Sequence, residues 1–322
     1  MKPILAAAAA ILALATTATA QTPAAPDDPE GTVVAELVVR AATPGPAWWK
    51  VSDADSTVWI LGLPAGYTPT KLAWDRSVLQ KRLAGAHALM APPMGSVSIQ
   101  GSGWKAAGMV ARMAPGVRWT NGNIEKDLPP VLASRFAAVR TKLKKPASRY
   151  GTPLPALAGL KLTQDYLDWA ALNGDVGDEA IAMAKKLKVP LVRPPTIAAA
   201  ALKLDEVGLD VPGPAACFAA MLDDVEAAPE HYRTAASAWA AGEVRQALAV
   251  RRDAFSICEN AIKMTGYSRK AIDAQTAAIA AALRKPGKAV AVVSLRQMVA
   301  DNGVVEGLRA RGLEVLDPAS LD

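Results

Sequence analysis

The sequence predicts an α/β fold in which a central mixed sheet is wrapped by many helices. Two short apolar runs flank the polar turn SDADS, at Trp48–Val51 and Thr57–Leu61, and indicate a β-hairpin. Short, partly β-branched apolar runs at Ala88–Ala91, Val189–Val192 and Ala289–Ser294 indicate buried strands. The long segments between them have helical periodicity, so we expect a large helical insertion before a C-terminal strand–helix–strand unit.

The first residues have the three parts of a secretory signal peptide in the right order. Lys2 supplies positive charge, Ile4–Ala15 is an apolar run too short to span a bilayer, and Ala18-Thr19-Ala20 is a small-residue cleavage site. We expect cleavage after Ala20 and export, most simply to a bacterial periplasm; an Ala-rich N-terminal helix is the alternative. Residues 21–45 lack periodicity and are rich in Ala, Pro, Thr, Asp and Glu, which predicts a disordered linker.

The remaining residues, 46–322, are enough for one large domain with its own core. Helical periodicity predicts helices at Trp74–Leu83, Pro129–Leu143, Asp178–Leu187, Thr196–Leu204, Ala215–Val225, His231–Trp239 and Ser268–Leu283. Gly312 then reads as a helix C-cap before a last strand, Leu313–Leu316.

Charge and hydropathy argue against nucleic-acid binding and against a transmembrane segment. The formal net charge is +6, but the basic runs, at 143–146 and 185–188, are short and carry no interleaved aromatic residues, so nucleic-acid binding is not expected. After the signal, no apolar run reaches 18 residues, so we expect no transmembrane segment in the mature chain.

The two cysteines, Cys217 and Cys258, each lie in a predicted helix. In an oxidising compartment an even pair more often forms a disulfide than a metal site, and a separation of 41 residues fits no C-x-x-C pattern. Two buried free thiols are the alternative.

The segment STVWILGLPAGYTP at 56–69 resembles the opening of the TraB/GumN family, which includes the TIKI-type metalloproteases. The family stretch reads roughly STIYLFGTVHVLPP, and its His is a proposed metal ligand or catalytic residue. Here Gly62 is kept, but the His position is Ala65. The family's next strand ends in a Glu, and that position falls on Pro92.

The resemblance continues to the C-terminal end of the chain. The second family Glu falls on Pro195, within GDEAIAMAKKLKVPLVRPPT at 177–196. Gly287-Lys288 and the segment Arg309–Gly312 match the family framework. The family's functional GAGH becomes SLRQ, which places Gln297 at the His position.

Metal hydrolysis needs several ligands that converge on one ion and leave a position open for water. Ala and Pro side chains supply no ligand, and a Gln amide oxygen is a weak one for a transition metal. The resemblance therefore implies a catalytically inactive pseudoenzyme, with no metal or cofactor, that binds an unknown ligand or an envelope protein partner. The alternatives are a metal-dependent hydrolase or protease with displaced ligands, and an envelope protein linked to polysaccharide export.

Other residues give little sign of a rebuilt site. His87 and His231 are not spaced as a helical pair, and the acidic cluster Asp223-Asp224…Glu226 reads as a solvated helix face. No G-x-S-x-G or phosphate-binding loop is found. The chain has eight Trp but only three Phe, and we expect the Trp residues to pack in the core, some of them lining the former site. Six of them are Trp48, Trp49, Trp59 and Trp74 near the first strands, and Trp104 and Trp119 in the first helical region.

Overall fold

The computed structural model describes residues 30–37, 39–100, 123–151, 155–203, 212–250, 258 and 266–321. The predicted signal peptide, Trp104 and Trp119 lie outside the described residues. The strands are β1 (Trp48–Ser52), β2 (Ser56–Leu63), β3 (Leu89–Met90), β4 (Gly95–Gln100), β5 (Leu191–Val192), β6 (Ile197–Lys203), β7 (Gly287–Ser294) and β8 (Glu314–Leu316). The α-helices are α1 (Ser77–Leu83), α3 (Pro130–Lys142), α4 (Pro155–Ala170), α5 (Val176–Lys186), α6 (Pro212–Glu226), α7 (Pro229–Ala240), α8 (Val244–Leu248), α10 (Tyr267–Ala282), α11 (Leu295–Val299) and α12 (Val304–Arg309). Three short 3₁₀ helices are Ala35–Leu37, Ile124–Lys126 and Ala147–Tyr150.

A six-stranded mixed sheet in the order β5-β3-β7-β2-β1-β8 organises one half of the molecule, as the sequence predicts. Strands β5, β3, β7 and β2 are parallel, whereas β1 is antiparallel to both β2 and β8. The predicted hairpin is present, with Trp48 opposite Leu61 and Ser52 opposite Thr57. Its turn is held by Asp53, whose Oδ1 accepts hydrogen bonds from the backbone N–H and the hydroxyl of Ser56.

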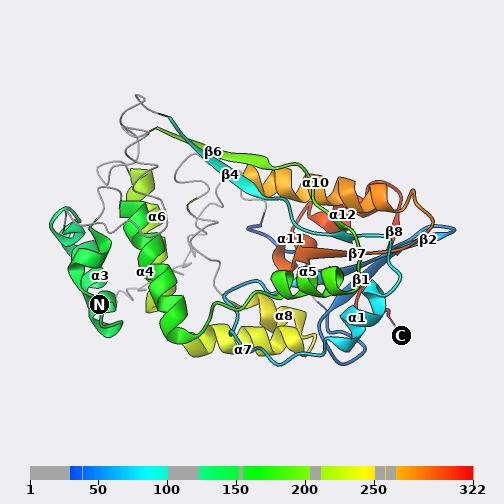
Figure 1. The fold of residues 1–322 in the computed structure, drawn as a ribbon, viewed down its shortest axis with the longest axis horizontal. Helices are drawn as coiled ribbons and strands as arrows, with labels where there is room; N and C mark the ends of the chain where they lie inside the picture. The colour runs from blue at the N-terminus through cyan, green and yellow to red at the C-terminus, as the bar shows by residue number, and fades with distance from the viewer. Residues whose placement is uncertain are drawn as a thin grey trace, which may run out of the picture.

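Helices cover both faces of this sheet, so its central strands are buried on both sides. Figure 1 shows α10 and α12 above the sheet and α1 and α5 below it. We call the six-stranded sheet with α1, α5, α10, α11 and α12 the sheet lobe. Strand β7 is almost entirely buried, as its unbroken apolar run from Ala289 to Val293 predicts.

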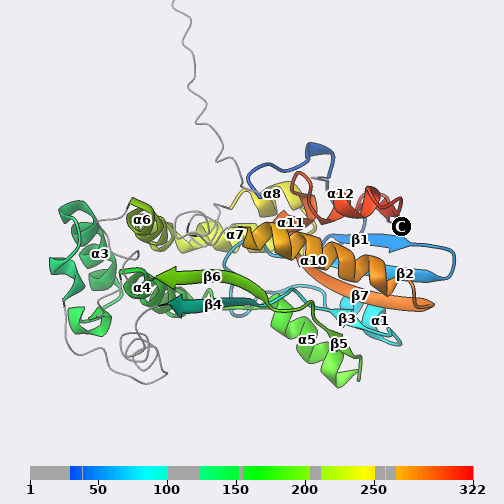
Figure 2. The ribbon, with the colours of Figure 1, turned by 90° about the horizontal axis from the view of Figure 1, so that it is seen from above.

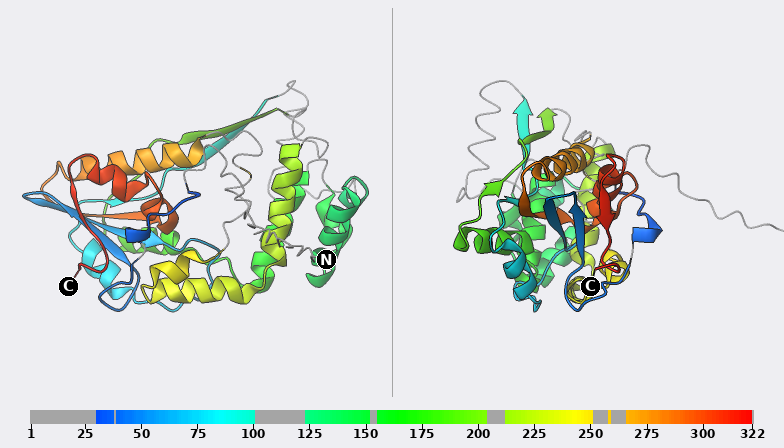
Figure 3. Two further views of the ribbon diagram at one scale, coloured as in Figure 1. Left: turned by 180° about the vertical axis from the view of Figure 1, so that it is seen from behind. Right: turned by 90° about the vertical axis from the view of Figure 1, so that its right-hand side faces the viewer.

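A second group of helices, α3, α4 and α6, lies at the other end of the molecule, and we call it the helical lobe (Figure 1). Its core is formed by rings and aliphatic side chains that include Phe136, Tyr150, Tyr166 and Phe218. Helix α7 joins the lobes, because Tyr232 near its start packs in the helical-lobe core and Trp239 near its end packs in the sheet-lobe core. The same two-lobe arrangement is seen from behind in Figure 3.

A parallel two-stranded ribbon, β4–β6, also runs between the lobes (Figure 2). It corrects the prediction of a helix at Thr196–Leu204, since Ile197–Lys203 is strand β6. Four consecutive alanines favour a helix by intrinsic propensity, but the segment pairs along its length with β4. Tertiary pairing therefore overrides the local preference.

Part of the segment predicted as a disordered linker, 21–45, is described by the structure, in residues 30–37 and 39–45, and makes contacts with distant parts of the chain. Val33 bridges to Ala300, the Val34 N–H donates to Val299 O over 2.8 Å, and Leu37 is buried in the sheet-lobe core. Backbone groups of Ala41 and Ala42 bond to Gly242 and Pro318. The composition of the segment does not show these long-range partners.

Candidate functional site

The four positions implied by the resemblance follow the four parallel strands of the sheet. Ala65 comes after β2, Pro92 after β3 and Pro195 after β5, while Gln297 lies in α11 directly after β7. Strands β2 and β7 end in register, with Leu63 opposite Ser294. Because parallel strands have their carboxyl ends at one edge of a sheet, all four positions lie at that edge, where α/β folds place their sites.

Gly62, the residue retained from the family motif, lies where α11 comes closest to β2. A Cβ atom at this position would be 2.7 Å from Leu295 Cδ1 and 3.1 Å from Trp49 Cζ3. The Gly62 carbonyl also accepts a 2.6 Å hydrogen bond from Trp239 Nε1. Gly62 therefore has a structural role in packing α11 and α7 against the end of β2.

Ala65 belongs to an apolar environment. Its half-buried side chain packs, together with that of Tyr67, against the core cluster of the helical lobe. Two residues later, the Tyr67 hydroxyl donates a 3.1 Å hydrogen bond to Asp224 Oδ2 of α6. This bond ties the same stretch of chain to the helical lobe. The position of the expected His is thus part of the contact between the two lobes.

Gln297 is engaged on both sides of its amide. Its Nε2 donates to Glu30 Oε1 over 2.8 Å, and its Oε1 accepts a 3.0 Å hydrogen bond from Gln275 Nε2. Glu30 and Gln275 are themselves buried, at 8% and 4% exposure. Sequence reasoning missed Glu30 because it lies in the predicted linker, and no local signal links it to a residue more than 260 positions later.

The two proline positions offer backbone groups only. Pro92 O accepts a 3.3 Å hydrogen bond from Arg193 Nη1, and Pro195 is exposed. Their neighbours Ala91 and Pro194 line a small cavity with Gln275, of about 10 Å³. This volume is room for about one water molecule.

The two histidines do not form a metal site. His87 is partly buried, with its Nε2 enclosed and without a hydrogen-bond partner among the described residues. Burial, and then the charge of Lys285, lower its pKa, so the ring stays neutral near pH 7. His231 is exposed near the start of α7. Within the described ranges, no three His, Cys, Asp or Glu side chains are grouped so that they could hold a metal ion.

The acidic cluster of α6 is only partly the solvated face that the sequence predicts. Asp223 and Glu226 pair with Arg135 of α3, at 2.5 and 2.7 Å. Asp224 instead points inward and is 1% exposed, since the helix turns it toward Tyr67. The prediction of a solvated face is therefore wrong for Asp224.

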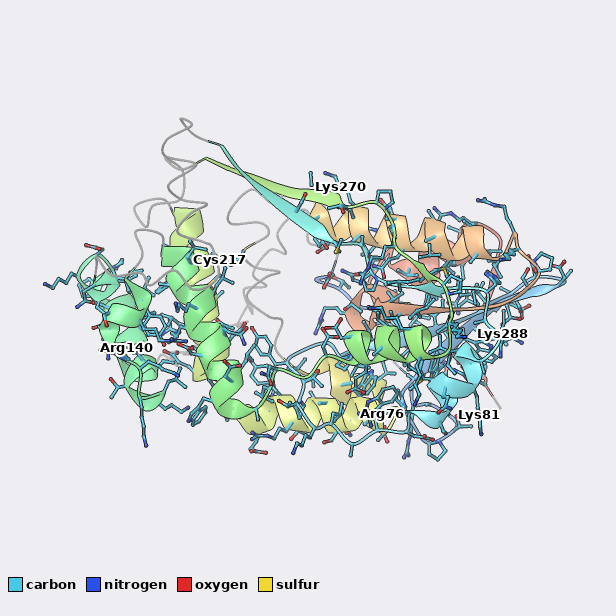
Figure 4. All side chains as sticks on the ribbon, viewed as in Figure 1. Arg76, Lys81, Arg140, Cys217, Lys270 and Lys288 are labelled. Atoms are coloured by element: carbon cyan, nitrogen blue, oxygen red, sulfur yellow. A yellow bond between two sulfur atoms is a disulfide. The ribbon has the colours of Figure 1, made fainter. Side chains whose placement is uncertain are left out.

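The structure joins Cys217 of α6 to Cys258 in a disulfide, as expected from the even pair, with their Cα atoms 4.6 Å apart. Figure 4 shows Cys217 in the helical lobe, away from the sheet. Ala220 and Met221 pack with the two cysteines in a small buried cluster. In the described part of the chain, we find no helix that combines the length and the apolar character needed to cross a bilayer.

Comparison with known proteins agrees with the resemblance in the sequence. The model of the TraB/PrgY/gumN family matches residues 47–316, which is most of the chain. No curated protein and no solved structure matches it. The matched range begins at the first strand of the sheet and ends with β8, so it includes both lobes and all four positions at the sheet edge.

Proposed function

Because the chain belongs to the TraB/PrgY/gumN family, we propose that it is an exported, catalytically inactive member that acts by binding a ligand or an envelope partner. The observation that carries this proposal is the set of side chains at the carboxyl edge of the sheet: Ala65, Pro92, Pro195 and Gln297. Three supply no metal ligand, and the amide of the fourth is engaged by Glu30 and Gln275.

The chemistry of this donor set argues against metal-assisted hydrolysis. A catalytic zinc site uses about three protein ligands and keeps one position for water. An ion held in this way lowers the pKa of its water from about 15.7 toward 7, which supplies a hydroxide nucleophile at neutral pH. Neither His87 nor His231 lies at the sheet edge formed by the ends of β2, β3, β5 and β7, so these two residues do not replace the missing ligands.

Export is the second part of the proposal. The first twenty residues carry the pattern of a signal peptide with cleavage after Ala20. A disulfide between the two cysteines of the chain fits an oxidising compartment such as the periplasm. Sequencing the N-terminus of protein recovered from the periplasmic fraction tests this, and we expect it to begin at Gln21.

The test of inactivity is the metal content of the purified protein together with its hydrolytic activity. We expect less than stoichiometric transition metal and no chelator-sensitive peptidase or esterase turnover. The variant Ala65→His should also stay inactive, because one added ligand does not make a site. Stoichiometric metal with chelator-sensitive turnover by the unmodified protein would overturn the proposal.

A second candidate, a metal-dependent hydrolase with displaced ligands, is favoured by Glu30. Its carboxylate reaches the sheet edge and lies 2.8 Å from the Gln297 amide nitrogen. In this case the variant Glu30→Gln would lose bound metal, whereas in the inactive protein it would change neither metal content nor turnover.

A further inference from the structure

Arg82 at the end of α1 is a partly buried arginine that has no acidic partner among the described residues. Its guanidinium carbon lies 4.2 Å from the ring centroid of Trp48 and 3.9 Å from that of Trp59. Nη1 is enclosed and has no hydrogen-bond acceptor among the described residues. Burial lowers the pKa of the guanidinium to about 10, so the group still carries its charge at neutral pH.

Arg76, labelled in Figure 4, lies six residues earlier, directly before α1, and its nitrogens have hydrogen-bond acceptors. It also lies over an indole, 4.9 Å from the centroid of Trp74, but its Nε donates to Glu179 over 2.8 Å. Its other nitrogens donate to the carbonyls of Trp74 and Leu72. Arg82 has the aromatic contacts but no carboxylate partner in the part of the chain that the structure describes, although charges withdrawn from water in proteins are normally paired.

A cavity of about 30 Å³ borders Arg82 and Trp48. Most of its other lining residues have apolar side chains, and they come from three parts of the chain: the N-terminal segment, α1 and the C-terminal segment. They include Pro44, Pro46, Val78, Pro318 and Leu321. None of the family positions at the sheet edge lines it. The volume is room for about two water-sized groups.

We propose that this cavity, the Arg82 pocket, binds the carboxylate of a ligand that has an apolar group next to it. A carboxylate supplies two oxygens in one plane, which matches the fork of a guanidinium and the two-group volume of the pocket. The proline and leucine walls then contact the apolar neighbour. A free small acid and the C-terminus of a peptide share this chemistry. Because none of the four sheet-edge positions lines the Arg82 pocket, it can bind a carboxylate whether or not the sheet edge is catalytic.

Titration of the purified protein, followed by the NMR signals of its indole N–H groups, tests the pocket. The probes are N-acetylleucine, its carboxamide, inorganic phosphate, and a short peptide that ends in leucine with a free carboxylate. We expect saturable binding of N-acetylleucine with a Kd on the order of 1 mM, and binding of the carboxamide at least about tenfold weaker. Tighter binding of the peptide would identify a chain terminus as the source, and equal binding would identify a small acid.

The variant Arg82→Met should lose acid binding, and Arg82→Lys should weaken it because an ammonium lacks the planar fork. Arg76→Met is the matched control: it removes a Trp-stacked arginine from the same segment and should leave binding unchanged. Equal binding of acid and carboxamide, tighter binding of phosphate, no saturable binding, or full binding by Arg82→Met would each overturn the proposal. The carboxamide comparison needs no variant, so it decides the question even if Arg82→Met does not fold.

Discussion

The two lobes fill their interiors with different chemistry. The sheet-lobe core consists largely of aliphatic side chains on paired strands, such as Val58, Ile60, Val290 and Val292. The helical-lobe core contains buried tyrosines and carboxylates, and a disulfide lies beside it. The backbone ladder and aliphatic contacts of the sheet lobe depend on neither pH nor redox state. Among the described residues, the helical lobe has two buried carboxylates, Asp165 and Asp224, and the neighbouring disulfide, whereas the sheet lobe has one buried carboxylate, Glu30, so acid and reductant should act on the helical lobe first.

The clearest example of this polar chemistry is Asp165 of α4, which is 3% exposed. It accepts hydrogen bonds from Arg149 and from the Tyr150 hydroxyl, the latter over 2.7 Å. The ring of Tyr150 stacks edge-on against Phe136, which also contacts Phe218 of α6. One buried unit therefore connects the 3₁₀ helix Ala147–Tyr150, α3, α4 and α6.

The largest effect should follow removal of the ring at the centre of this unit. Phe136→Ala should lower the free energy of unfolding by roughly 3–5 kcal/mol, because a fully buried ring leaves a cavity that its neighbours fill only in part. Hydrogen exchange should quicken in α3, α4 and α6 while the β2–β7 amides stay protected. Chemical denaturation with residue-resolved exchange measures both.

Val131→Ala is the matched control on the same helix, since Val131 is 70% exposed and its truncation should cost less than about 0.5 kcal/mol. Equal loss of protection in both lobes would show that they unfold as one unit, and the contrast between them would then fail.

Breaking the disulfide should have the next largest effect. The double variant Cys217→Ser/Cys258→Ser should lose about 3–4 kcal/mol, because the bond closes a loop with a sequence separation of 41. Urea unfolding with and without reductant measures this. Reductant should destabilise the unmodified protein and leave the double variant unchanged. If reductant has no effect on either protein, the two cysteines do not hold the helical lobe together.

Both lobes contain elements that can be predicted from the sequence, such as β7 in the sheet lobe and α3 in the helical lobe. The hairpin and β7 follow from local patterns, namely a polar turn between apolar runs and an unbroken buried run. Strand β6 was misassigned because its alanines resemble a helix, and the overlooked signal was the alternation Ser96-Val97-Ser98-Ile99 in its partner β4. A strand whose identity depends on its neighbour cannot be read from its own composition.

The candidate site also has a part that could be predicted from the sequence and a part that could not. The positions Ala65, Pro92, Pro195 and Gln297 came from a resemblance along the chain, and strand order explains why they share an edge. The contact of Glu30 with Gln297 joins segments far apart in sequence, so no periodicity could reveal it.

The Arg82 pocket also depends on contacts that local sequence does not show. In the hairpin register Trp48 lies opposite Leu61, which makes Trp48 and Trp59 diagonal neighbours on adjacent strands. Arg82 of α1 then lies against both rings.

Acid should destabilise the helical lobe through Asp165. Burial opposes ionisation of its carboxyl group, but the hydrogen bonds from Arg149 and Tyr150 outweigh this and hold its pKa below the usual value of 3.8. A depressed pKa in the folded state gives stability that is present above about pH 4 and is lost as the pH falls through the folded-state pKa. Melting temperature measured between pH 7 and pH 2 should therefore drop below about pH 4.

Asp165→Asn should reduce stability at pH 7 by about 1–3 kcal/mol and flatten this acid limb, since an amide does not titrate. Asp168→Asn, which alters an exposed carboxylate on the same helix, should keep the limb. An unchanged acid limb in Asp165→Asn would mean that other groups control the response to acid.

The smallest effect should come from surface ion pairs, and here the two lobes should agree. Arg135 joins α3 to α6 through Asp223 and Glu226, and Arg76 joins the start of α1 to α5 through Glu179. All of these side chains are 27–42% exposed, so water screens the charges, and Arg135→Met and Arg76→Met should each cost about 1 kcal/mol or less. Raising the ionic strength should shrink both losses. Comparable losses of stability in the two variants would mean that the lobes differ only in their interiors. A much larger, salt-insensitive loss in Arg135→Met would mean that they also differ in their surface ion pairs.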